Sequence, residues 1–560
     1  MADESLTADE GVVAGESVTA GARAPAPRLK HRIPVRVRHY WKLLAVCGLS
    51  LVALVVLAGN VEIRPIVTSG GAGKSDDVVE NVAGTVDLFD ATIAHTITLS
   101  YGEAEYQRMM DEFIATGEKE YLRADLTIDG TVVEDVGIRL KGNSTLSGLT
   151  HKGKTRSLFG EDNGGGPGGG RPGGGFPGGG QIPGGGQMPG DGQMPGGGQM
   201  PGGGQMADGL PGGGMGTVSL DSSRPEELPW LISFDEFADG RRYQGHRQVA
   251  LRISGMGGGS TVLNEAVSLA LIGKTSEPAQ QYAYSGLRVN GRPVRTRLLV
   301  ETPDAGFAES LGDGVLYKTL STGQFTYQGE DQTDYTEDFK QINNKGSYDL
   351  QPVIDLVKWV EQSSDADFAA HLADHVDVTA FAKYLALQNL LLNFDDMAGP
   401  GRNLYLWYDL STKKFRIVGW DYNLTFSGSA TQGPHDSTSM GGRFGGGMQL
   451  PDGVKLPEGF TPPQQAGGDP GGGFSMGGNK LKERFLAADA FKQIYDDAYR
   501  ELYRNLFGNG AAEQALNTIT TTLSKVDGYD AAAVKSDADK LRSTIQQRTT
   551  ALAKDAVVTG

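Results

Sequence analysis

Three oxygen-bearing side chains lie close together in the stretch 391–426, which reads LLNFDDMAGPGRNLYLWYDLSTKKFRIVGWDYNLTF. Asp395 lies in an acidic loop, Asn403 opens one predicted strand, and Asp421 directly follows the next. A short hairpin between the two strands should bring these three side chains together. A base Asp, a metal-binding Asn and a metal-binding Asp in this order suit phosphoryl transfer. Mg²⁺ is usually held by few protein oxygens plus phosphates.

The same spacing also fits a simpler interpretation. Asp and Asn are common in turns, where their side chains bond to nearby backbone groups. Two solvated turn aspartates and an Asp that caps a strand would give the same pattern, and the spacing alone does not choose between the alternatives.

The elements around this stretch are predicted from hydrophobic periodicity. Helical sequence dominates 352–392, and the hairpin strands are expected over 404–408 and 415–419. Further towards the N-terminus, strands are expected around 132–140, 230–234 and 249–253, a helix over 263–271, and a hairpin at the turn signal Asn290–Gly291. Amphipathic helices are expected over 480–557.

Composition excludes several classes of site. The net charge of −17 argues against a general nucleic-acid binder, which needs a basic surface. Cys47 is the single cysteine, so disulfides, thiol nucleophiles and Cys-ligated zinc are excluded from the main domain. His371 and His375 are four residues apart, but no third metal ligand is evident, so we interpret them as surface or core side chains.

An uncharged apolar run over 43–61 is long enough to cross a bilayer. Basic residues precede it, which places residues 1–42 in the cytoplasm as a disordered tail and the rest of the chain outside. A cleaved signal peptide is the alternative, but the run is long and no clear cleavage site follows it. We therefore expect a single-pass anchor in the cell membrane, followed by a linker over 62–89.

Two glycine-rich tracts, 160–216 and 428–478, interrupt the main domain. They contain too little apolar surface to offset the entropy of ordering, so we expect disordered insertions. Methionines recur every six residues in the first tract. Their thioethers could bind Cu(I), but no His or Cys joins them, so a low-complexity spacer is the simpler interpretation. The second tract follows Asp421, which suggests the hypothesis of a mobile lid.

Several short motifs resemble, in the same order, those of the spore-coat protein H (CotH) family of atypical kinase-like proteins. They are GIRLKGNS over 137–144, FDEFADGRRYQG over 234–245, NEA over 264–266, LYK over 316–318, and NFD, NLYLW and WDYNLTF within 393–426. The resemblance runs from about residue 90 to 545. It implies an α+β, two-lobed protein-kinase-like fold that uses ATP with Mg²⁺ or Mn²⁺.

The resemblance also assigns roles. It implies that Asp395 is the catalytic base, that Asn403 and Asp421 bind the metal, and that Glu265 is the helix carboxylate that pairs with a phosphate-binding lysine. The resemblance therefore implies that Asp395 and Glu265 are catalytic residues.

The phosphate-binding lysine itself is missing from its family position. The family has it on the strand over 230–234, where this sequence has none. Lys141 and Arg252 are the candidate nucleotide-binding cations that remain, with Lys154 further upstream. The glycine-rich segment 255–259 could bind over the phosphates of a nucleotide, or it could be a simple turn.

We therefore expect a membrane-anchored, extracytoplasmic kinase that transfers phosphate from ATP to a protein acceptor. The alternative is a non-catalytic kinase-like scaffold for envelope or spore-coat assembly or adhesion. The missing lysine and the scarcity of ATP outside the membrane favour that alternative.

Overall fold

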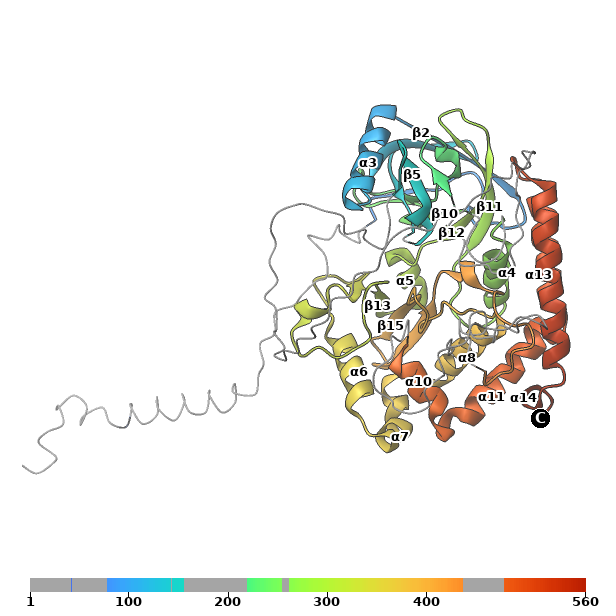
Figure 1. Ribbon diagram of the computed structural model, residues 1–560. Coiled ribbons are helices and arrows are strands. Elements are labelled where there is room, and N and C mark those ends of the chain that lie inside the picture. The colour runs from blue at the N-terminus through green and yellow to red at the C-terminus, as the bar shows by residue number, and fades with distance from the viewer. Residues whose placement is uncertain (1–41, 43–77, 143, 156–218, 254–260, 437–477) are drawn as a thin grey trace, which may run out of the picture. The chain divides into compact units, whose positions relative to one another are not determined.

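The computed structural model describes residues 42, 78–142, 144–155, 219–253, 261–436 and 478–560 (Figure 1). Its contacts divide the chain into two units, 1–65 and 66–560. Only Lys42 of the first unit is described, so the fold below is that of the second. The predicted tail, membrane span and linker lie almost entirely outside the described residues, as do tract 160–216, segment 255–259 and most of tract 428–478. None of the described residues belongs to a helix long and apolar enough to cross a membrane.

The N-terminal half forms a closed seven-stranded barrel. In order around the barrel its strands are β10 (Gln248–Arg252), β12 (Arg295–Glu301), β11 (Tyr282–Val289), β2 (Ala94–Tyr101), β3 (Leu122–Ile128), β4 (Thr131–Leu140) and β8 (Trp230–Ser233). The β11–β2 pair is parallel, and the other pairs are antiparallel. Alternate apolar side chains such as Ile97, Leu126 and Ile138 point inward and form a buried core.

Smaller elements surround the barrel. Helix α3 (Glu103–Thr116) buries one apolar face. The short strand β1 (Glu80–Val82) pairs with β9 (Arg241–Tyr243), and β5 (Leu149–His151) pairs with β6 (Lys154–Thr155) and β7 (Leu220–Asp221). The predicted hairpin at Asn290–Gly291 is confirmed as β11–β12, and both turn residues have positive φ, 46° and 72°.

The C-terminal half combines a four-stranded antiparallel sheet with helices. The sheet order is β14 (Phe339–Gln341), β13 (Gly314–Thr319), β15 (Leu404–Asp409) and β16 (Phe415–Gly419). Around the sheet lie α5 (Ala305–Leu311), α6 (Gln351–Gln362), α7 (Asp365–His375), α8 (Val378–Leu390), α10 (Lys480–Ala487), α11 (Asp489–Tyr503), α12 (Ala511–Leu523), α13 (Ala531–Leu552) and α14 (Ala556–Thr559). The mixture of helices and strands confirms the α+β class.

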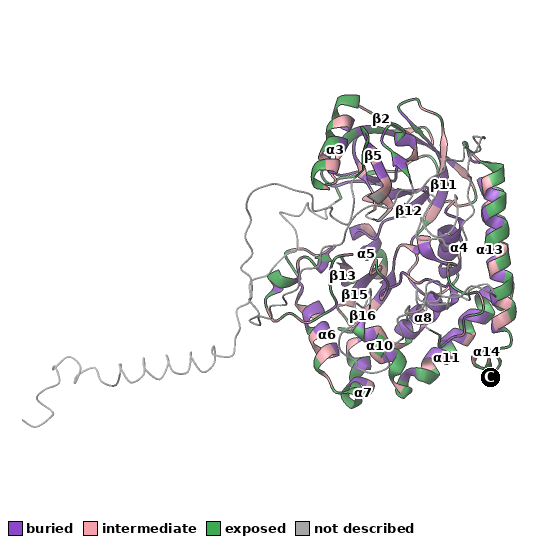
Figure 2. Ribbon diagram, in the orientation of Figure 1, coloured by how far each residue is buried: buried purple, intermediate pink, exposed green. Residues whose placement is uncertain are grey.

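Helix α4 (Leu263–Ile272) lies between the barrel strands β10 and β11 in the sequence, and it packs against α12, α13 and the segment Tyr422–Leu424 of the C-terminal half. It is buried almost throughout, whereas α13 keeps an exposed outer face (Figure 2). The side chain of Asn264 donates a 2.5 Å hydrogen bond to the carbonyl of Asn423, and Ser268 Oγ lies 2.9 Å from Thr425 Oγ1. Helix α4 is thereby fixed to the segment that directly follows Asp421.

Candidate functional site

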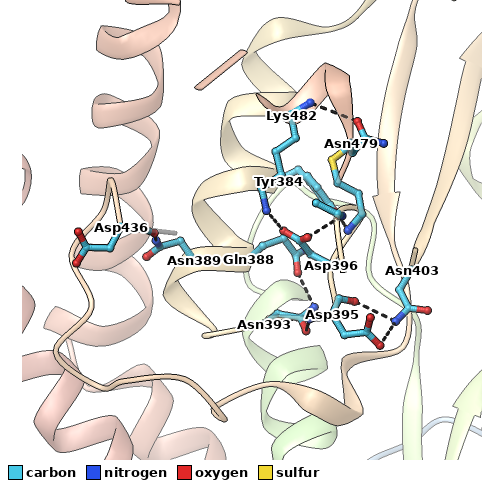
Figure 3. Close-up of polar contacts among 12 residues, drawn as sticks. Tyr384, Gln388, Asn389, Asn393, Asp395, Asp396, Asn403, Asp436, Asn479 and Lys482 are labelled. Carbon is cyan, nitrogen blue, oxygen red and sulfur yellow. Dashed lines mark hydrogen bonds and ion pairs between the residues drawn. The ribbon is translucent and has the colours of Figure 1, made fainter. Parts of the chain in front are cut away.

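The predicted strands 404–408 and 415–419 are confirmed as β15 and β16, and the hairpin brings the three predicted side chains to one cavity. Asp395, Asn403 and Asp421 all line this cavity of about 420 Å³. Asn403 Nδ2 donates to Asp395 Oδ2 at 2.9 Å and to the carbonyl of Asp395 at 3.0 Å (Figure 3). Because the amide nitrogen points at Asp395, the oxygen of the same amide remains for another ligand.

The loop between Asp395 and Asn403 requires glycine. The backbone N–H of Gly401 donates to Asp395 Oδ1 at 2.5 Å. A Cβ at position 401 would lie 2.6 Å from Asp395 Oδ2, which is closer than real contacts allow. The break in the sequence at Gly399-Pro400-Gly401 therefore lets the backbone approach the carboxylate.

Burial raises the pKa of Asp395 to about 6, and the nearby charge of Asp421 adds to this effect. The hydrogen bonds from Gly401 and Asn403 act in the opposite direction. At neutral pH the carboxylate is therefore mostly ionised, and its pKa is near the range of an efficient general base.

Asp421 has a strained backbone. Its φ of 61° lies in the left-handed region, which is costly for a residue with a Cβ and is concentrated at functional sites. Its Oδ1 atom is buried and has no hydrogen-bond partner among the described residues. A buried carboxylate oxygen without a hydrogen bond is costly unless a cation or ligand contacts it.

Arg252 joins two of the acidic side chains. Its Nη2 atom lies 3.1 Å from Glu265 Oε1 and 3.2 Å from Asp421 Oδ1, at angles that do not make hydrogen bonds. Burial raises the pKa of Glu265 to about 7, although Arg252 acts to lower it. The structure therefore places Arg252, at the end of β10, beside the α4 carboxylate, where the family resemblance implies a lysine.

Lys141 lines the same cavity from the end of β4. Burial, and then the charges of Lys318 and Arg252, hold the pKa of Lys141 well below its usual range. Both Lys141 and Arg252 contact the ring of Trp420, at 5.1 and 4.9 Å from its centroid. By contrast, Lys154 is exposed on β6 and is not among the residues that line this cavity.

Sequence reasoning missed other basic residues that line the cavity: Lys119, Arg139, Lys318 and Arg402. Arg139 falls within the GIRLKGNS motif and Lys318 within the LYK motif. These motifs indicated the family resemblance, but nothing in the sequence indicated that the two side chains line the same cavity. They come from strands about 180 positions apart, and only the packing of the barrel on the sheet brings them together.

The neighbouring Asp396 has a different role. Its carboxylate pairs with Lys482 of α10 (Figure 3). It also accepts a hydrogen bond from the backbone N–H of Ala398 at 2.8 Å. Next to it, Asn393 Nδ2 donates to Gln388 Oε1 at 2.8 Å. These contacts fix the loop that carries Asp395 to α8 and α10.

The donor set suits a hard divalent cation. No group of three His, Cys, Asp or Glu side chains that could hold a metal is found in the described part of the chain. The candidate set here consists of the carboxylate of Asp421, the amide oxygen of Asn403 and ligand oxygens. Mg²⁺ prefers such oxygen donors and keeps few protein ligands. Asp421 Oδ1 accepts no hydrogen bond but lies 3.2 Å from Arg252 Nη2, so this atom can bind a metal only if the guanidinium moves away.

Comparison with known proteins gives one family. A family model described as CotH kinase protein matches residues 216–552, which include Arg252, Glu265, Asp395, Asn403 and Asp421. No curated protein matches the chain.

Proposed function

The chain belongs to the CotH kinase family, and from this premise we propose that it transfers phosphate from ATP to a hydroxyl group of a protein. The observation that carries the proposal is that the hydrogen-bonded pair Asp395–Asn403 and Asp421 line one cavity. Kinase-like catalysis needs this set: a base, a metal-binding amide and a metal-binding carboxylate.

Each side chain has a defined task in this proposal. Asp395 accepts the proton of the acceptor hydroxyl as that oxygen bonds to the γ-phosphorus, and ADP leaves as the bond to the β-phosphate oxygen breaks. Asn403 orients Asp395 through its amide nitrogen. Asn403 and Asp421 would hold Mg²⁺ or Mn²⁺, which neutralises charge on the phosphates when bound.

The two-lobed kinase-like arrangement is part of the proposal. The strands of the barrel contribute Lys141 and Arg252 to the lining of the cavity, and the sheet and its loops contribute Asp395, Asn403 and Asp421. In this arrangement Glu265 of α4 orients the Arg252 guanidinium, which takes the role of the phosphate-binding lysine. Such positioning supplies most of the rate enhancement in phosphoryl transfer.

We further propose that the protein acts outside the cell, anchored by the apolar run 43–61. The basic residues on the N-terminal side of this run support the orientation. The partners would then be the cytoplasmic membrane and an exported acceptor protein.

Replacing the base tests the proposed reaction. Asp395→Asn should lower Mg²⁺-dependent phosphate transfer or ATP turnover by about 100-fold or more, because a positioned general base contributes at least that factor. Asp313→Asn is a matched control, since Asp313 is exposed and is not among the residues that line the cavity. Equal activity of the Asp395→Asn and Asp313→Asn proteins, both folded, would contradict the assignment.

One observation favours a second function, a non-catalytic scaffold for the envelope or spore coat. Arg252 lies 3.2 Å from Asp421 Oδ1, so a protein cation contacts the carboxylate that a metal would need. If this contact persists when nucleotide is added, the fold serves assembly rather than catalysis.

A further inference from the structure

Arg402 lies inside the loop that carries the proposed base, but the proposed reaction gives it no task. The backbone N–H of Gly401 donates to one carboxylate oxygen of Asp395, and the side chain of Asn403 donates to the other. Arg402 is the residue between these two donors, and it lines the same cavity. Its side chain therefore begins one residue away from each group that holds the base.

The backbone at Arg402 has a conformation that favours glycine. Its φ of 47° lies in the left-handed region, which costs free energy for a residue with a Cβ. The loop already contains glycine at Gly399 and Gly401, yet this position has an arginine. Strain of this kind is concentrated at functional sites. The arginine side chain must therefore contribute something that offsets the strain.

A hydrogen bond fixes the direction of this side chain. Arg402 Nη1 donates to the carbonyl of Ser321 at 2.7 Å. Strands β13 and β15 pair as far as Lys318 and Tyr405, so the same antiparallel register places Ser321 opposite Arg402. Both residues line the cavity. The turn between β13 and β14 therefore holds the arginine beside the cavity.

Most of the guanidinium remains available to a ligand. It has five N–H donors, and one of them has an acceptor among the described residues. Burial raises the pKa of Asp338, and the charge of Arg402 acts in the opposite direction. Both oxygens of this carboxylate, however, already accept hydrogen bonds from Gln324 and Gln328, and no carboxylate of a described residue lies within ion-pair distance of Arg402.

A cation in the loop of the base suits the group that is transferred. During transfer the phosphoryl group spreads negative charge over three oxygens, and its phosphorus lies beside the hydroxyl that Asp395 deprotonates. Lys141 and Arg252 come from strands of the barrel, whereas Arg402 belongs to the same loop as Asp395. The planar fork of an arginine matches two oxygens of one phosphoryl group.

We propose that Arg402 is a further catalytic residue, whose guanidinium donates hydrogen bonds to the oxygens of the phosphoryl group during transfer. This inference rests on the proposed function, because it requires ATP in the cavity. The guanidinium keeps its protons: the proton of the acceptor hydroxyl goes to Asp395, the bond from its oxygen to phosphorus forms, and the bond to ADP breaks. Arg402 therefore stabilises the transition state more than the bound nucleotide.

Affinity for a mimic of the transferred group tests the inference without an acceptor. Mg²⁺ and ADP would be titrated calorimetrically into the full-length chain, with and without aluminium fluoride, which takes the place of the phosphoryl group. Mimics of a transition state bind about 100-fold or more tightly than ordinary ligands. We therefore expect aluminium fluoride to increase the affinity of the unsubstituted chain by about that factor.

Substitutions of Arg402 should remove this gain selectively. Arg402→Met should lose most of it, with less than about a twofold change in affinity for Mg²⁺ and ADP alone. ATP turnover should fall about 100-fold or more, the loss expected when one stabilising donor is removed. Arg402→Lys keeps the charge but not the fork, so it should recover part of both. Arg402→Gly suits the left-handed backbone, so it should fold at least as well and show the loss of Arg402→Met.

Arg292→Met is the matched control. Arg292 Nη1 also donates to a serine carbonyl, that of Ser223, at 2.7 Å. It lies in the turn between β11 and β12 and is not among the residues that line the cavity. This variant should keep both the gain from aluminium fluoride and the ATP turnover.

Two results would overturn the inference and leave the proposed function standing. One is an undiminished gain from aluminium fluoride and undiminished turnover in Arg402→Met, even with a lower melting temperature, because the bond to Ser321 would then be its whole role. The other is an equal loss of affinity for ADP with and without aluminium fluoride, which would make Arg402 an ordinary nucleotide ligand. If the unsubstituted chain binds no nucleotide with Mg²⁺, the proposed function fails and the inference fails with it.

Discussion

Arg252 is the residue on which the two candidate functions differ. As a phosphate ligand it replaces the family lysine, because its guanidinium contacts the α4 carboxylate of Glu265 at 3.1 Å. As a permanent partner of Asp421, at 3.2 Å, it would compete with a metal ion. Arginine forms rigid, planar contacts that lysine does not, so an arginine in the place of the lysine would hold phosphates with a different geometry.

Substitution of Arg252 separates these roles. If Arg252 binds phosphates, Arg252→Met should weaken nucleotide affinity about tenfold or more, the loss expected for a charged hydrogen bond, and Arg252→Lys should recover part of it. Isothermal titration with ATP and Mg²⁺ measures the affinity.

The matched control is Arg416→Met. Arg416 forms a similar pair with the buried Glu277, at 3.2 Å, but lines a different cavity. Tighter metal and nucleotide binding by Arg252→Met than by the unsubstituted chain would contradict the catalytic role and favour the scaffold.

A second residue-scale prediction concerns His95 and Asp129, whose side chains lie 2.7 Å apart in the barrel. Burial lowers the pKa of His95, but the hydrogen bond and charge of Asp129 outweigh burial, and the net shift is upward. The stability that this pair contributes is fully present below pH 6.5 and is lost as pH rises through the folded pKa. The free energy of unfolding should therefore fall as pH rises above 6.5.

Urea unfolding at pH 6 and pH 8 measures this change, and His95→Gln removes the titrating group. The decrease in stability between the two pH values should be smaller in His95→Gln. An identical decrease in both proteins would show that the pair makes no pH-dependent contribution.

The sequence predicted the polar core of the site because its members lie within about thirty residues of one another. Asp395, Asn403 and Asp421 follow from the spacing of one hairpin. Arg139 and Lys318 could not be predicted, because their convergence depends on how the barrel packs against the sheet. Arg402 directly precedes Asn403 in the same loop and was overlooked. Lys141 and Arg252 were identified as alternatives, and the structure places both in the cavity.

At the scale of elements, one side chain of α13 fixes the end of α8 and the segment around Gln432. Arg548 is fully buried and donates hydrogen bonds to the carbonyls of Leu390 and Asn389 at 3.0 and 2.9 Å, and to that of Gln432 at 2.6 Å. Leu390 ends α8, just before Asp395, and Gln432 follows Asp421. Arg548 is therefore a positioning residue for both segments.

Arg548→Met should lower the free energy of unfolding by at least about 2–3 kcal/mol, since it leaves several buried carbonyls without a donor. Urea unfolding measures this. Arg542→Met, in the same helix, is the control, because Arg542 is partly exposed and pairs with Asp539. Equal stability of the two variants would contradict the role given to Arg548.

The short-range elements were predicted well and the barrel was not. The helix expected over 263–271 and the strands over 404–408 and 415–419 match α4, β15 and β16 within one residue. The closed barrel depends on the parallel pairing of β2 with β11, whose paired residues are 190 positions apart. Hydrophobic alternation identifies strands but does not specify such distant partners.

At the scale of the whole molecule, the membrane anchor remains a prediction. The full-length chain should remain with the membrane fraction after an alkaline carbonate wash, because an uncharged segment of this length is held by the bilayer core. A chain without residues 1–61 should appear in the soluble fraction. Recovery of the full-length chain in the soluble fraction would contradict the anchor.

The central claim is that the cavity binds a nucleotide with a divalent metal. Its most direct test is the thermal stability of the full-length chain with and without ATP and Mg²⁺ or Mn²⁺, beside the Asp421→Ala variant. A ligand at about 100 times its dissociation constant stabilises the folded state by about 2.7 kcal/mol. We predict a clear rise in melting temperature that is lost in Asp421→Ala. No rise with any nucleotide or metal, on a folded sample, would contradict the claim.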